Sequence, residues 1–211
     1  MNVGPDPMPP RPCRGRAECG CPSRPSRSGL VPLRLDVTDH ATVAAAANDV
    51  SIVINNAGIG GASTGLLEGD FAGARQAMEV NYFGTWAASR AFAPVLARNG
   101  GGALVNMLSL ASWLGQPQFP GYAASKAAQW SLTDALRQAL HTQGTLVVGV
   151  HAGFVDTDLS AWTDAPKVGA STVAELTMDA LANDRLEVLA GEETRHVKAA
   201  LSQPASTTPG S

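Results

Sequence analysis

The sequence has little net charge, few aromatic side chains and no long hydrophobic run. Its 211 residues carry a formal net charge of −3, with 5% aromatic residues and a mean hydropathy of +0.01. Because the charges are balanced, there is no basic field, and we expect no nucleic-acid partner. No apolar stretch reaches the roughly 18 residues that cross a bilayer. The N-terminus also lacks the apolar core of a signal peptide, so we expect no membrane contact and a cytoplasmic location.

Cysteine is scarce and confined to the start of the chain. Half of the fourteen prolines also fall in the first 25 residues. The three cysteines are Cys13, Cys19 and Cys21. No histidine or second cysteine pair stands at zinc-finger spacing, so we predict no metal site. The composition instead predicts that residues 1–28 form a disordered, Pro/Arg/Cys-rich segment.

From residue 30 onward, short apolar runs alternate with alanine-rich helical stretches. The runs are LVPLRLDV (30–37), SIVINNAG (51–58), GGALVNML (101–108) and TLVVGVHAG (145–153). The helical stretches are 41–48, 71–98 and the segment from Tyr122 to about His141. This alternation predicts an α/β fold with a Rossmann-like, doubly wound parallel sheet. We place one domain at 29–203 and a flexible tail at 204–211.

A tyrosine and a lysine stand four residues apart in GYAASKAAQW (121–130), so Tyr122 and Lys126 share one face of a helix. A phenol has an ordinary pKa near 10, and a neighbouring ammonium lowers it towards neutral pH, where proton transfer is useful. Ser109 ends a predicted strand thirteen residues before the tyrosine. Its hydroxyl can hold a substrate carbonyl oxygen, and Ser112 is the rival for that role.

Five motifs along the chain resemble those of the short-chain dehydrogenases/reductases. They are NNAG at 55–58, Asn81 in VNYFG, Ser109 in NMLSLASW, YAASK at 122–126 and AGFVDTD at 152–158. The resemblance covers about residues 30–201 and implies a Rossmann-type fold with a nicotinamide cofactor, NAD or NADP. It also implies hydride transfer between that cofactor and a small-molecule carbonyl or alcohol. The long helices around 71–98 and 122–141 imply a homodimer or homotetramer.

The resemblance assigns roles to individual residues. Tyr122 matches the catalytic acid/base, and Ser109 the residue that orients the substrate oxygen. Lys126 matches the lysine that lowers the tyrosine pKa and binds the nicotinamide ribose, and Asn81 the asparagine that holds a proton-relay water. The cofactor-binding residues implied are Asp36 and Val37 near the adenine, Asn55, Ala57 and Gly58 along the ribose, Tyr122 and Lys126, and Val155 and Thr157 at the carboxamide.

The last motif departs from the family pattern. It usually opens with proline, and here Ala152 holds that place, preceded by His151. We interpret His151 as a hydrogen-bonded buried polar group rather than a catalyst. Asp156 and Asp158 are interpreted as loop and helix-cap residues rather than a metal pair. Four tryptophans are interpreted as core or pocket-wall residues: Trp86, Trp113, Trp130 and Trp162.

The sequence shows no glycine-rich turn between a first strand and a helix, where this type of fold holds the cofactor pyrophosphate. GIGGAS (58–63) follows a strand, but it continues NNAG into a loop. We therefore expect SIVINN (51–56) to form an exposed sheet edge, and cofactor binding to be weakened or lost. The residue that separates NAD from NADP cannot be read.

Two further hypotheses stay open. In the first, the chain is a catalytically inactive, truncated homologue that acts as a partner-binding subunit. In the second, residues 1–28 are not the natural N-terminus, because Arg, Pro, Gly, Ala, Ser and Cys dominate there, as in GC-rich DNA translated out of frame.

Overall fold

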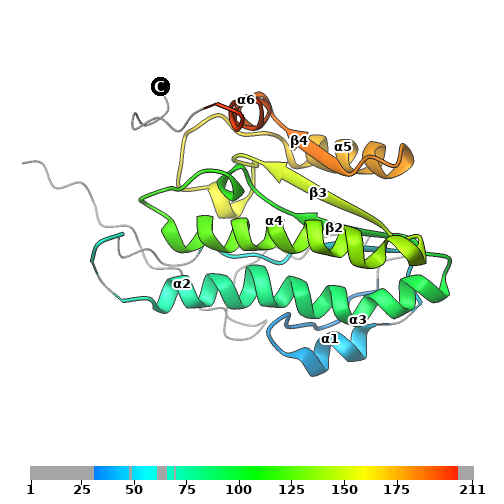
Figure 1. Ribbon diagram of the computed structural model, residues 1–211. Coiled ribbons are helices and arrows are strands. Elements are labelled where there is room, and N and C mark those ends of the chain that lie inside the picture. Colours follow the sequence, from blue (N-terminus) through cyan, green and yellow to red (C-terminus); the bar gives the residue numbers. More distant parts are fainter. Residues whose placement is uncertain (1–30, 48, 61–65, 69, 204–211) are drawn as a thin grey trace, which may run out of the picture. The chain divides into compact units, whose positions relative to one another are not determined.

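The computed structural model describes residues 31–47, 49–60, 66–68 and 70–203. The chain divides into two units, 1–34 and 35–211, and the helices and strands of the described residues all lie in the second (Figure 1). The predictions for residues 1–28 and 204–211 concern segments outside the described residues. The fold is therefore that of the unit 35–211.

Four parallel strands form one sheet in the order β1-β2-β3-β4. They are β1 (Ile52–Asn55), β2 (Ala103–Met107), β3 (Leu146–Ala152) and β4 (Glu187–Ala190). The register sets Asn55 beside Asn106, so the carboxyl ends of β1 and β2 meet at one edge of the sheet. The predicted α/β class is confirmed, and three of the four predicted strands are present.

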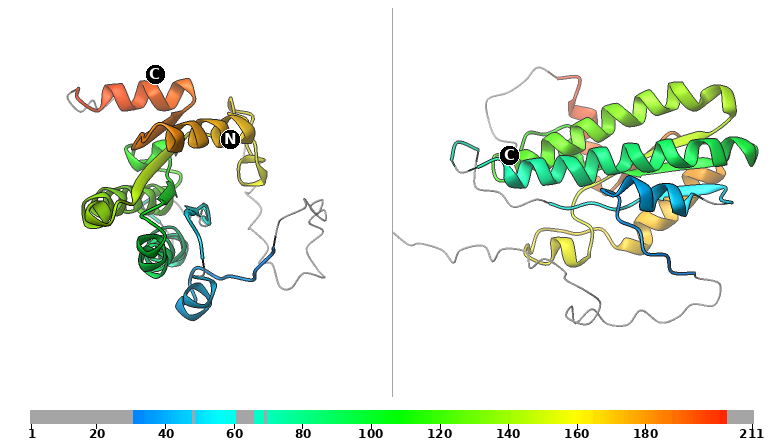
Figure 2. Two further views of the ribbon diagram at one scale, coloured as in Figure 1. Left: turned by 90° about the vertical axis from the view of Figure 1, so that its right-hand side faces the viewer. Right: turned by 90° about the horizontal axis from the view of Figure 1, so that it is seen from below.

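Helices cover both faces of the sheet (Figure 2). On one face α3 (Thr85–Arg98) and α4 (Pro120–Leu140) pack on β1 to β3. The cluster there is Val53, Leu96, Leu104, Leu140 and Val147. On the other face α5 (Ala170–Ala182) packs on β2 to β4. The cluster there includes Val105, Val148, Val150, Val173, Ala180 and Val188. Strands buried on both faces explain the continuous apolar runs of β2 and β3.

The connection β3-α5-β4 has the opposite hand to the two connections before it. All three step the same way along the sheet, but α3 and α4 lie on one face and α5 on the other. One hand is strongly preferred for parallel crossovers, so this reversal marks the C-terminal end of the sheet as unusual.

The predicted helix 71–98 is helical throughout but changes its winding in the middle. It consists of α2 (Ala72–Ala77), the π-helical segment η1 (Met78–Gly84) and α3. Such π segments are rare and occur frequently at functional sites. Asn81 lies within η1 and is fully buried.

The predicted strand 30–37 is wrong for the part that the structure describes. Residues 31–36 form no strand, and Pro32 has no N–H to donate to a ladder. The chain instead turns at Asp36 and enters α1 (His40–Ala46), which Asp39 caps and which packs on α3.

The expected exposed edge is confirmed, because β1 ends the described sheet. Val53 is 9% exposed, but Ile52 and Ile54 on the opposite face of the strand are 44% and 50% exposed. One face of β1 is therefore covered by helices, and the other stands open.

The sequence analysis placed no element after residue 153, where the structure adds a helix, a strand and another helix. These are α5, the short strand β4 and α6 (Glu192–Ala200). Three 3₁₀ turns complete the unit: η2 (Leu110–Ser112), η3 (His141–Gln143) and η4 (Asp158–Ser160). None of the described helices combines the length and apolar character needed to cross a membrane.

Candidate active site

α4 carries Tyr122 and Lys126, and its first turn is fixed by close packing against α2. A Cβ atom on Gly121 would lie 2.6 Å from the Cα atom of Ala74, so only glycine allows the two helices to approach this closely. Pro120 occupies the first turn, where its missing N–H costs nothing. Lys126 Nζ lies 5.9 Å from the centroid of the Tyr122 ring, so both side chains lie on one face of α4.

Ser109 follows β2 and caps the turn η2. Its hydroxyl accepts a hydrogen bond from the N–H of Ala111 at 3.1 Å, and its own N–H donates to Ser112 Oγ at 3.4 Å. The Ser109 side chain also lies beside Tyr122 and acts to lower the pKa of its phenol. The contact with the tyrosine therefore belongs to Ser109, while Ser112, the rival in the sequence analysis, braces the backbone of Ser109.

Burial raises the pKa of Tyr122 above its ordinary value of 10, and the neighbouring Ser109 side chain only partly opposes this. Lys126 was expected to bring that pKa down towards neutral pH, but in the structure without a bound ligand the net shift is upward. Burial dominates, and the ammonium is turned towards other acceptors. Tyr122 is consequently a protonated phenol at neutral pH.

Lys126 is buried and held by two hydrogen bonds. Its Nζ donates to the carbonyl oxygen of Met107 at 2.7 Å and to Gln129 Oε1 at 2.8 Å. Burial lowers the pKa of Lys126 to about 8, so the amine is mostly charged at neutral pH. Two of the three N–H groups of the ammonium are used within the described residues, which leaves one for a ligand.

Asn81 ties the end of β1 to α4. Its Nδ2 donates to the carbonyl oxygen of Ile59 and to Ser125 Oγ, both at 2.9 Å, and its Oδ1 accepts from the N–H of Ile59 at 2.9 Å. Ser125 Oγ in turn donates to the carbonyl oxygen of Tyr122 at 2.7 Å. Asn81 thus fixes the backbone on both sides of the site.

Gly58 lies between Asn81 and Lys126. A Cβ atom on Gly58 would lie 3.3 Å from Asn81 Oδ1 and 3.7 Å from Lys126 Nζ, yet the residue itself is exposed. Ala57 is exposed as well. A bare backbone strip beside a buried ammonium offers a surface against which a ligand can lie closely. Asn55 differs, because its amide turns inward and donates to Asn106 Oδ1 at 2.8 Å.

These residues fit the ribose and nicotinamide side of a nicotinamide cofactor. The strip at 57–58 gives close approach, and the remaining N–H of Lys126 can donate to a hydroxyl. For the pyrophosphate, the described residues contain no glycine-rich turn that follows a strand and opens a helix. The fit is therefore limited to one half of the cofactor.

Asp36 and Val37 lie in the loop before α1. Asp36 is exposed, and its Oδ1 accepts from the N–H and the hydroxyl of Thr38 at 2.9 and 2.7 Å. Val37 packs on η1 at Gly84, where a Cβ atom would come within 2.7 Å of the valine side chain. This packing positions the loop against the segment that holds Asn81.

Val155 and Thr157 lie in the loop after β3. Val155 forms an isolated parallel bridge with Val168, and the Thr157 hydroxyl donates to the carbonyl oxygen of Val155 at 3.2 Å. Asp156 and Asp158 are exposed in this loop and at the start of η4. The described residues contain no group of three or more side chains suited to hold a metal ion.

His151 is fully buried near the end of β3 and stacks on Trp113 with ring centroids 3.9 Å apart. Its Nδ1 lies 3.2 Å from the carbonyl oxygen of Ser109. Its Nε2 lies 3.6 Å from Glu187 Oε1 and has no hydrogen-bond partner among the described residues. Burial lowers the pKa of His151 to about 4, so the ring is neutral and Nδ1 carries the proton. The expected hydrogen-bonded histidine is thus correct for Nδ1 and wrong for Nε2.

The tryptophans divide into two pairs. Trp113 and Trp130 pack edge to face with centroids 6.2 Å apart, and Lys198 Nζ lies 4.8 Å from the Trp113 ring. Trp86 and Trp162 are exposed, so neither belongs to the core. For these two residues the core alternative is wrong, and the pocket-wall alternative stays a prediction.

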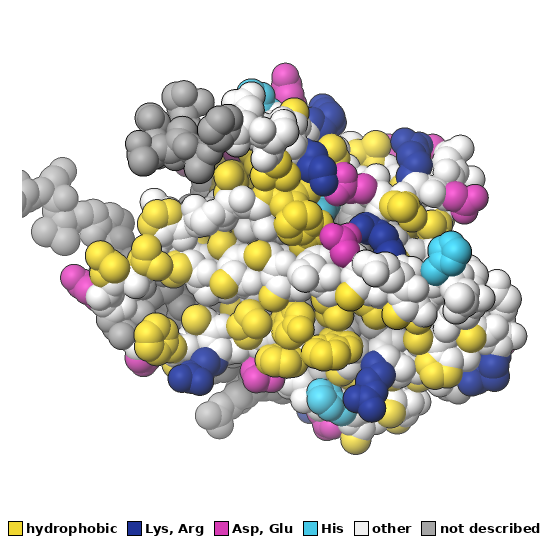
Figure 3. Space-filling view, viewed as in Figure 1, with side chains coloured by type: hydrophobic (Ala, Val, Ile, Leu, Met, Phe, Trp, Pro, Cys, Tyr) yellow, Lys and Arg dark blue, Asp and Glu magenta, His cyan; other side chains and the backbone are white. Residues whose placement is uncertain are grey.

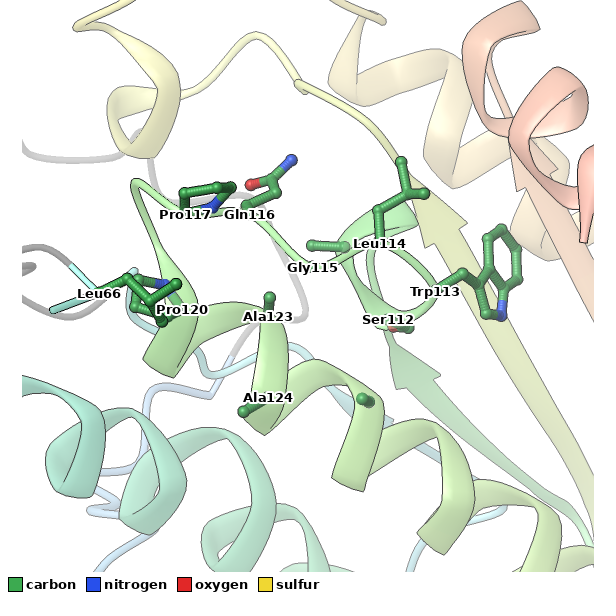
Figure 4. Close-up of a pocket in the computed structure, with 12 residues that line it drawn as sticks. Leu66, Ser112, Trp113, Leu114, Gly115, Gln116, Pro117, Pro120, Ala123 and Ala124 are labelled. Atoms are coloured by element: carbon green, nitrogen blue, oxygen red, sulfur yellow. The ribbon is translucent and has the colours of Figure 1, made fainter. Parts of the chain in front are cut away.

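A cavity of about 490 Å³ opens beside the site (Figure 4). Its wall includes Ala111 and Ser112, which follow Ser109, and Ala123, which follows Tyr122. Leu66 closes one side of the cavity. Neither the Ser109 nor the Tyr122 side chain lines this space, so the cavity borders these two side chains rather than containing them.

The sequence analysis missed a buried polar network behind Lys126. Hydrogen bonds from side chains to other side chains, and in two cases to the backbone carbonyls of Thr85 and Gln129, link Asn55, Thr85, Ser89, Asn106, Gln129 and Thr133. A signal was present in α4, where the polar residues Tyr122, Lys126, Gln129 and Thr133 recur every three to four positions. In an otherwise alanine- and leucine-rich helix, such a stripe predicts a polar surface turned into the protein.

Comparisons with known proteins place the chain in a family. The sequence profile of the short chain dehydrogenase family matches residues 24–167. The short chain dehydrogenase pigC of Monascus ruber is 31% identical over 169 residues, covering 71% of this chain and 56% of that protein. Galactitol 2-dehydrogenase (L-tagatose-forming) of Cereibacter sphaeroides is 39% identical over 133 residues, covering 59% of this chain and 52% of that protein. The chain spans about half the length of the curated relatives it matches.

Solved structures extend the likeness to the fold. A short chain dehydrogenase from Burkholderia cenocepacia in complex with NADP superposes with a TM-score of 0.77 at 35% identity, covering 82% of this chain and 76% of that one. A short chain dehydrogenase/reductase from Burkholderia phymatum in complex with NAD gives 0.75 at 27% identity, covering 86% and 79%. The profile match, which covers more than half of the chain, and the shared fold show that this chain belongs to the short chain dehydrogenase family.

Proposed function

We propose that the protein is an oxidoreductase that uses NAD or NADP and exchanges a hydride and a proton with a small carbonyl or alcohol substrate. The observation that carries this proposal is the placement of the Ser109 side chain beside Tyr122, next to the buried ammonium of Lys126. Two hydroxyl groups that converge next to a fixed cation suit proton transfer to a carbonyl oxygen.

Tyr122 acts as the acid when a carbonyl is reduced. Burial raises its pKa, so the phenol holds a proton at neutral pH and can give it to the substrate oxygen. The Ser109 hydroxyl hydrogen-bonds the same oxygen and polarises the carbonyl. The charge of Lys126 stabilises the phenolate that remains. A bound nicotinamide cofactor supplies the hydride.

The cofactor roles assigned from the family motifs stand as part of this proposal. Gly58, Ala57 and Lys126 would hold the ribose, supported by the open backbone strip beside the ammonium. Val155 and Thr157 would hold the carboxamide, with Asp36 and Val37 near the adenine and Asn55 shaping the strip from beneath. One related structure contains NADP and another NAD, which supports a nicotinamide cofactor and leaves both forms open.

The test is carbonyl reduction by a fusion in which a glycine-rich first βα unit precedes residue 29. Tyr122→Phe should lower the rate by about 10²–10⁴-fold, because it removes only the transferred proton. Cofactor affinity, measured by fluorescence titration, should stay nearly unchanged. Tyr82→Phe is a matched control, since Tyr82 is the other tyrosine of the chain and packs on Phe83 and Trp86.

Full turnover by Tyr122→Phe would end the assignment. Absence of turnover and of cofactor binding in the fusion itself would favour the alternative, a catalytically inactive homologue that serves as a partner-binding subunit. The two outcomes can be told apart, because the unsubstituted fusion is active in the first case and inactive in the second.

We also propose that the protein is a homodimer or homotetramer in the cytoplasm, without nucleic-acid or membrane partners. The balanced charge of the chain supports the expectation that nucleic acid is not a partner. Hydrophobic side chains gather over the α2 to α4 face (Figure 3), and Phe71, Phe83 and Trp86 are among the exposed ones. Light scattering at micromolar concentration should show the assembly, and Trp86→Gln should weaken it. A stable monomer of the unsubstituted protein would contradict this part.

A further inference from the structure

Gln129 is a buried amide in direct contact with Lys126. It lies one turn after the lysine on α4 and is completely inaccessible to solvent. Its Oε1 accepts a hydrogen bond from Lys126 Nζ at 2.8 Å, and its Nε2 donates to Thr85 Oγ1 at 2.8 Å. Both ends of the amide are therefore used, and its orientation is fixed because an ammonium only donates hydrogen bonds.

The contacts continue from Gln129 to the backbone of η1. Thr85 Oγ1, which accepts from the glutamine, donates to the carbonyl oxygen of Asn81 at 2.8 Å. Three side-chain hydrogen bonds thus run from Lys126 on α4, through Gln129 and Thr85, to Asn81. All three are buried, where hydrogen bonds are not weakened by competing water.

These hydrogen bonds can hold Lys126 in position, but they cannot relay a proton. A hydroxyl can pass a proton on, but a carboxamide gives up its own N–H only after accepting another proton on oxygen, which is costly. The amide also carries no charge, so it fixes the position of the ammonium without neutralising it. A carboxylate at the same place would form an ion pair and turn the lysine away from its ligand.

We propose that Gln129 is a positioning residue for Lys126, holding the ammonium in place and tying it through Thr85 to the backbone of Asn81. The part that Lys126 plays for Tyr122 and for the cofactor rests on the proposed function. The effect of Gln129 on Lys126 does not, since it is a property of the protein without ligand.

Among the described residues, the groups that contact the Lys126 ammonium are uncharged. β2 brings the carbonyl of Met107, the strip after β1 brings Gly58, and α3 brings Thr85 behind the glutamine. The titratable side chain beside it is Tyr122, whose ring centroid lies 5.9 Å from Lys126 Nζ. Burial alone accounts for the lowered pKa of Lys126. A change at position 129 should therefore be read directly in the titration of Lys126.

The experiment follows the lysine side chains of the 211-residue chain by NMR with ¹³C,¹⁵N-labelled lysine. The chain has only three lysines, so Lys167 and Lys198 serve as internal references, and Lys126→Arg assigns the remaining signal. Lys126 should titrate near pH 8 in the unsubstituted protein.

Gln129→Met is the decisive variant, because it keeps the volume and removes the acceptor. The charged form loses a hydrogen bond while burial is kept, so the pKa of Lys126 should fall below about 7.5. A purely structural role would predict the reverse, since loosened packing admits water and moves the pKa up towards its ordinary value of 10.5. Gln129→Glu should raise the pKa to about 9 or higher by placing a carboxylate beside the ammonium.

Gln143→Met is the matched control. Gln143 is a partly buried glutamine in η3, beyond the far end of α4, and its amide donates to Ala93 and Thr145. It should leave the titration of Lys126 unchanged, and circular dichroism checks that each variant is folded. A rise in the Gln129→Met pKa would overturn the proposal, and if that variant does not fold, an unshifted Gln129→Glu pKa would overturn it. Either result is independent of turnover, so the proposed function is judged separately by Tyr122→Phe.

Discussion

The two sides of the site differ sharply in how firmly they are built. Around α4, Asn81, Ser109 and Lys126 are buried, and hydrogen bonds reach each of them from two or more elements. Beyond β1, the loop that carries Asp36 is exposed, and one face of the strand is open to solvent. The part of the site suited to proton transfer is thus complete in the described residues, while the part that would meet the adenine and phosphates is not.

The groups proposed for proton transfer and the groups that would bind the cofactor tightly therefore lie in different parts of the molecule. A buried, hydrogen-bonded constellation is preorganised, so its geometry persists without ligand. Cofactor affinity in this type of fold comes largely from backbone amides at a helix N-terminus that meet the pyrophosphate. A protein can therefore hold its catalytic groups in place and still bind the cofactor poorly.

The largest expected effect concerns cofactor affinity. The 211-residue chain should bind NADH and NADPH only near the millimolar range, because several charge-assisted hydrogen bonds of about 1.5–3 kcal/mol each are not provided. Calorimetric titration checks this, with the fusion that adds a glycine-rich first βα unit as the comparison. The fusion should bind at least about 10³-fold more tightly. Micromolar binding by the unmodified chain would mean that residues outside the described ones form a phosphate site.

A smaller effect concerns His151, on the firmly built side. Its pKa is about 4 in the folded chain because of burial, against an ordinary value of 6.5. Between these values the unfolded chain binds a proton that the folded chain does not, so stability is full above about pH 6.5 and falls as the pH drops to 4. The loss should amount to about 3 kcal/mol.

Urea unfolding at pH 7, 5.5 and 4 measures this dependence. His151→Gln should make the profile shallower by up to one bound proton, while His196→Gln, an exposed histidine on α6, should leave it unchanged. Equal slopes for His151→Gln and the unsubstituted protein would mean that His151 is not buried in its neutral form.

The pattern of apolar residues predicted most of the fold. Of the predicted strands that are present, β2 and β3 are buried on both faces, and β1 lies at the sheet edge beside β2. The run 30–37 was misassigned for the opposite reason. It has the same apolar composition, but a strand also needs a partner and backbone donors, and Pro32 removes a donor. The short strand β4 was missed because four residues that alternate between partly buried and buried give too weak a signal.

The proposed catalytic residues could be picked out because their spacing repeats along a helix and at strand ends. The direction of the shift in the Tyr122 pKa could not be predicted. It depends on how deeply the phenol is buried and on where the Lys126 ammonium points, and packing sets both. The same holds for His151, whose stack on Trp113 joins residues far apart in sequence. Sequence patterns indicate which residues share a helix face or follow a strand. The burial and the orientation of a side chain are fixed only when the helices and strands pack together.

Gly121→Ala tests how tightly the firm side is built. The new Cβ atom would meet the backbone of Ala74, so α2 and α4 must separate. We expect a loss of about 1–2 kcal/mol in the free energy of unfolding, after the gain in helix propensity is counted. Gly115→Ala is the matched control, because nothing lies within 4 Å of its Cβ position. If both variants unfold alike in urea, the helices are not in contact at Gly121.

The smallest expected effect lies on the open face of β1. Ile54→Lys should change the free energy of unfolding by no more than about 0.5 kcal/mol, because the side chain is 50% exposed and lysine is well tolerated on edge strands. Val53→Lys, the adjacent position on the helix-covered face, should instead cost several kcal/mol by burying a charge without a partner. Ile54→Lys should also reduce turbidity on heating, since charge on an edge strand opposes edge-to-edge pairing. A loss of more than about 2 kcal/mol in Ile54→Lys would show that this face is covered in solution, and the contrast between the two sides of the site would then disappear.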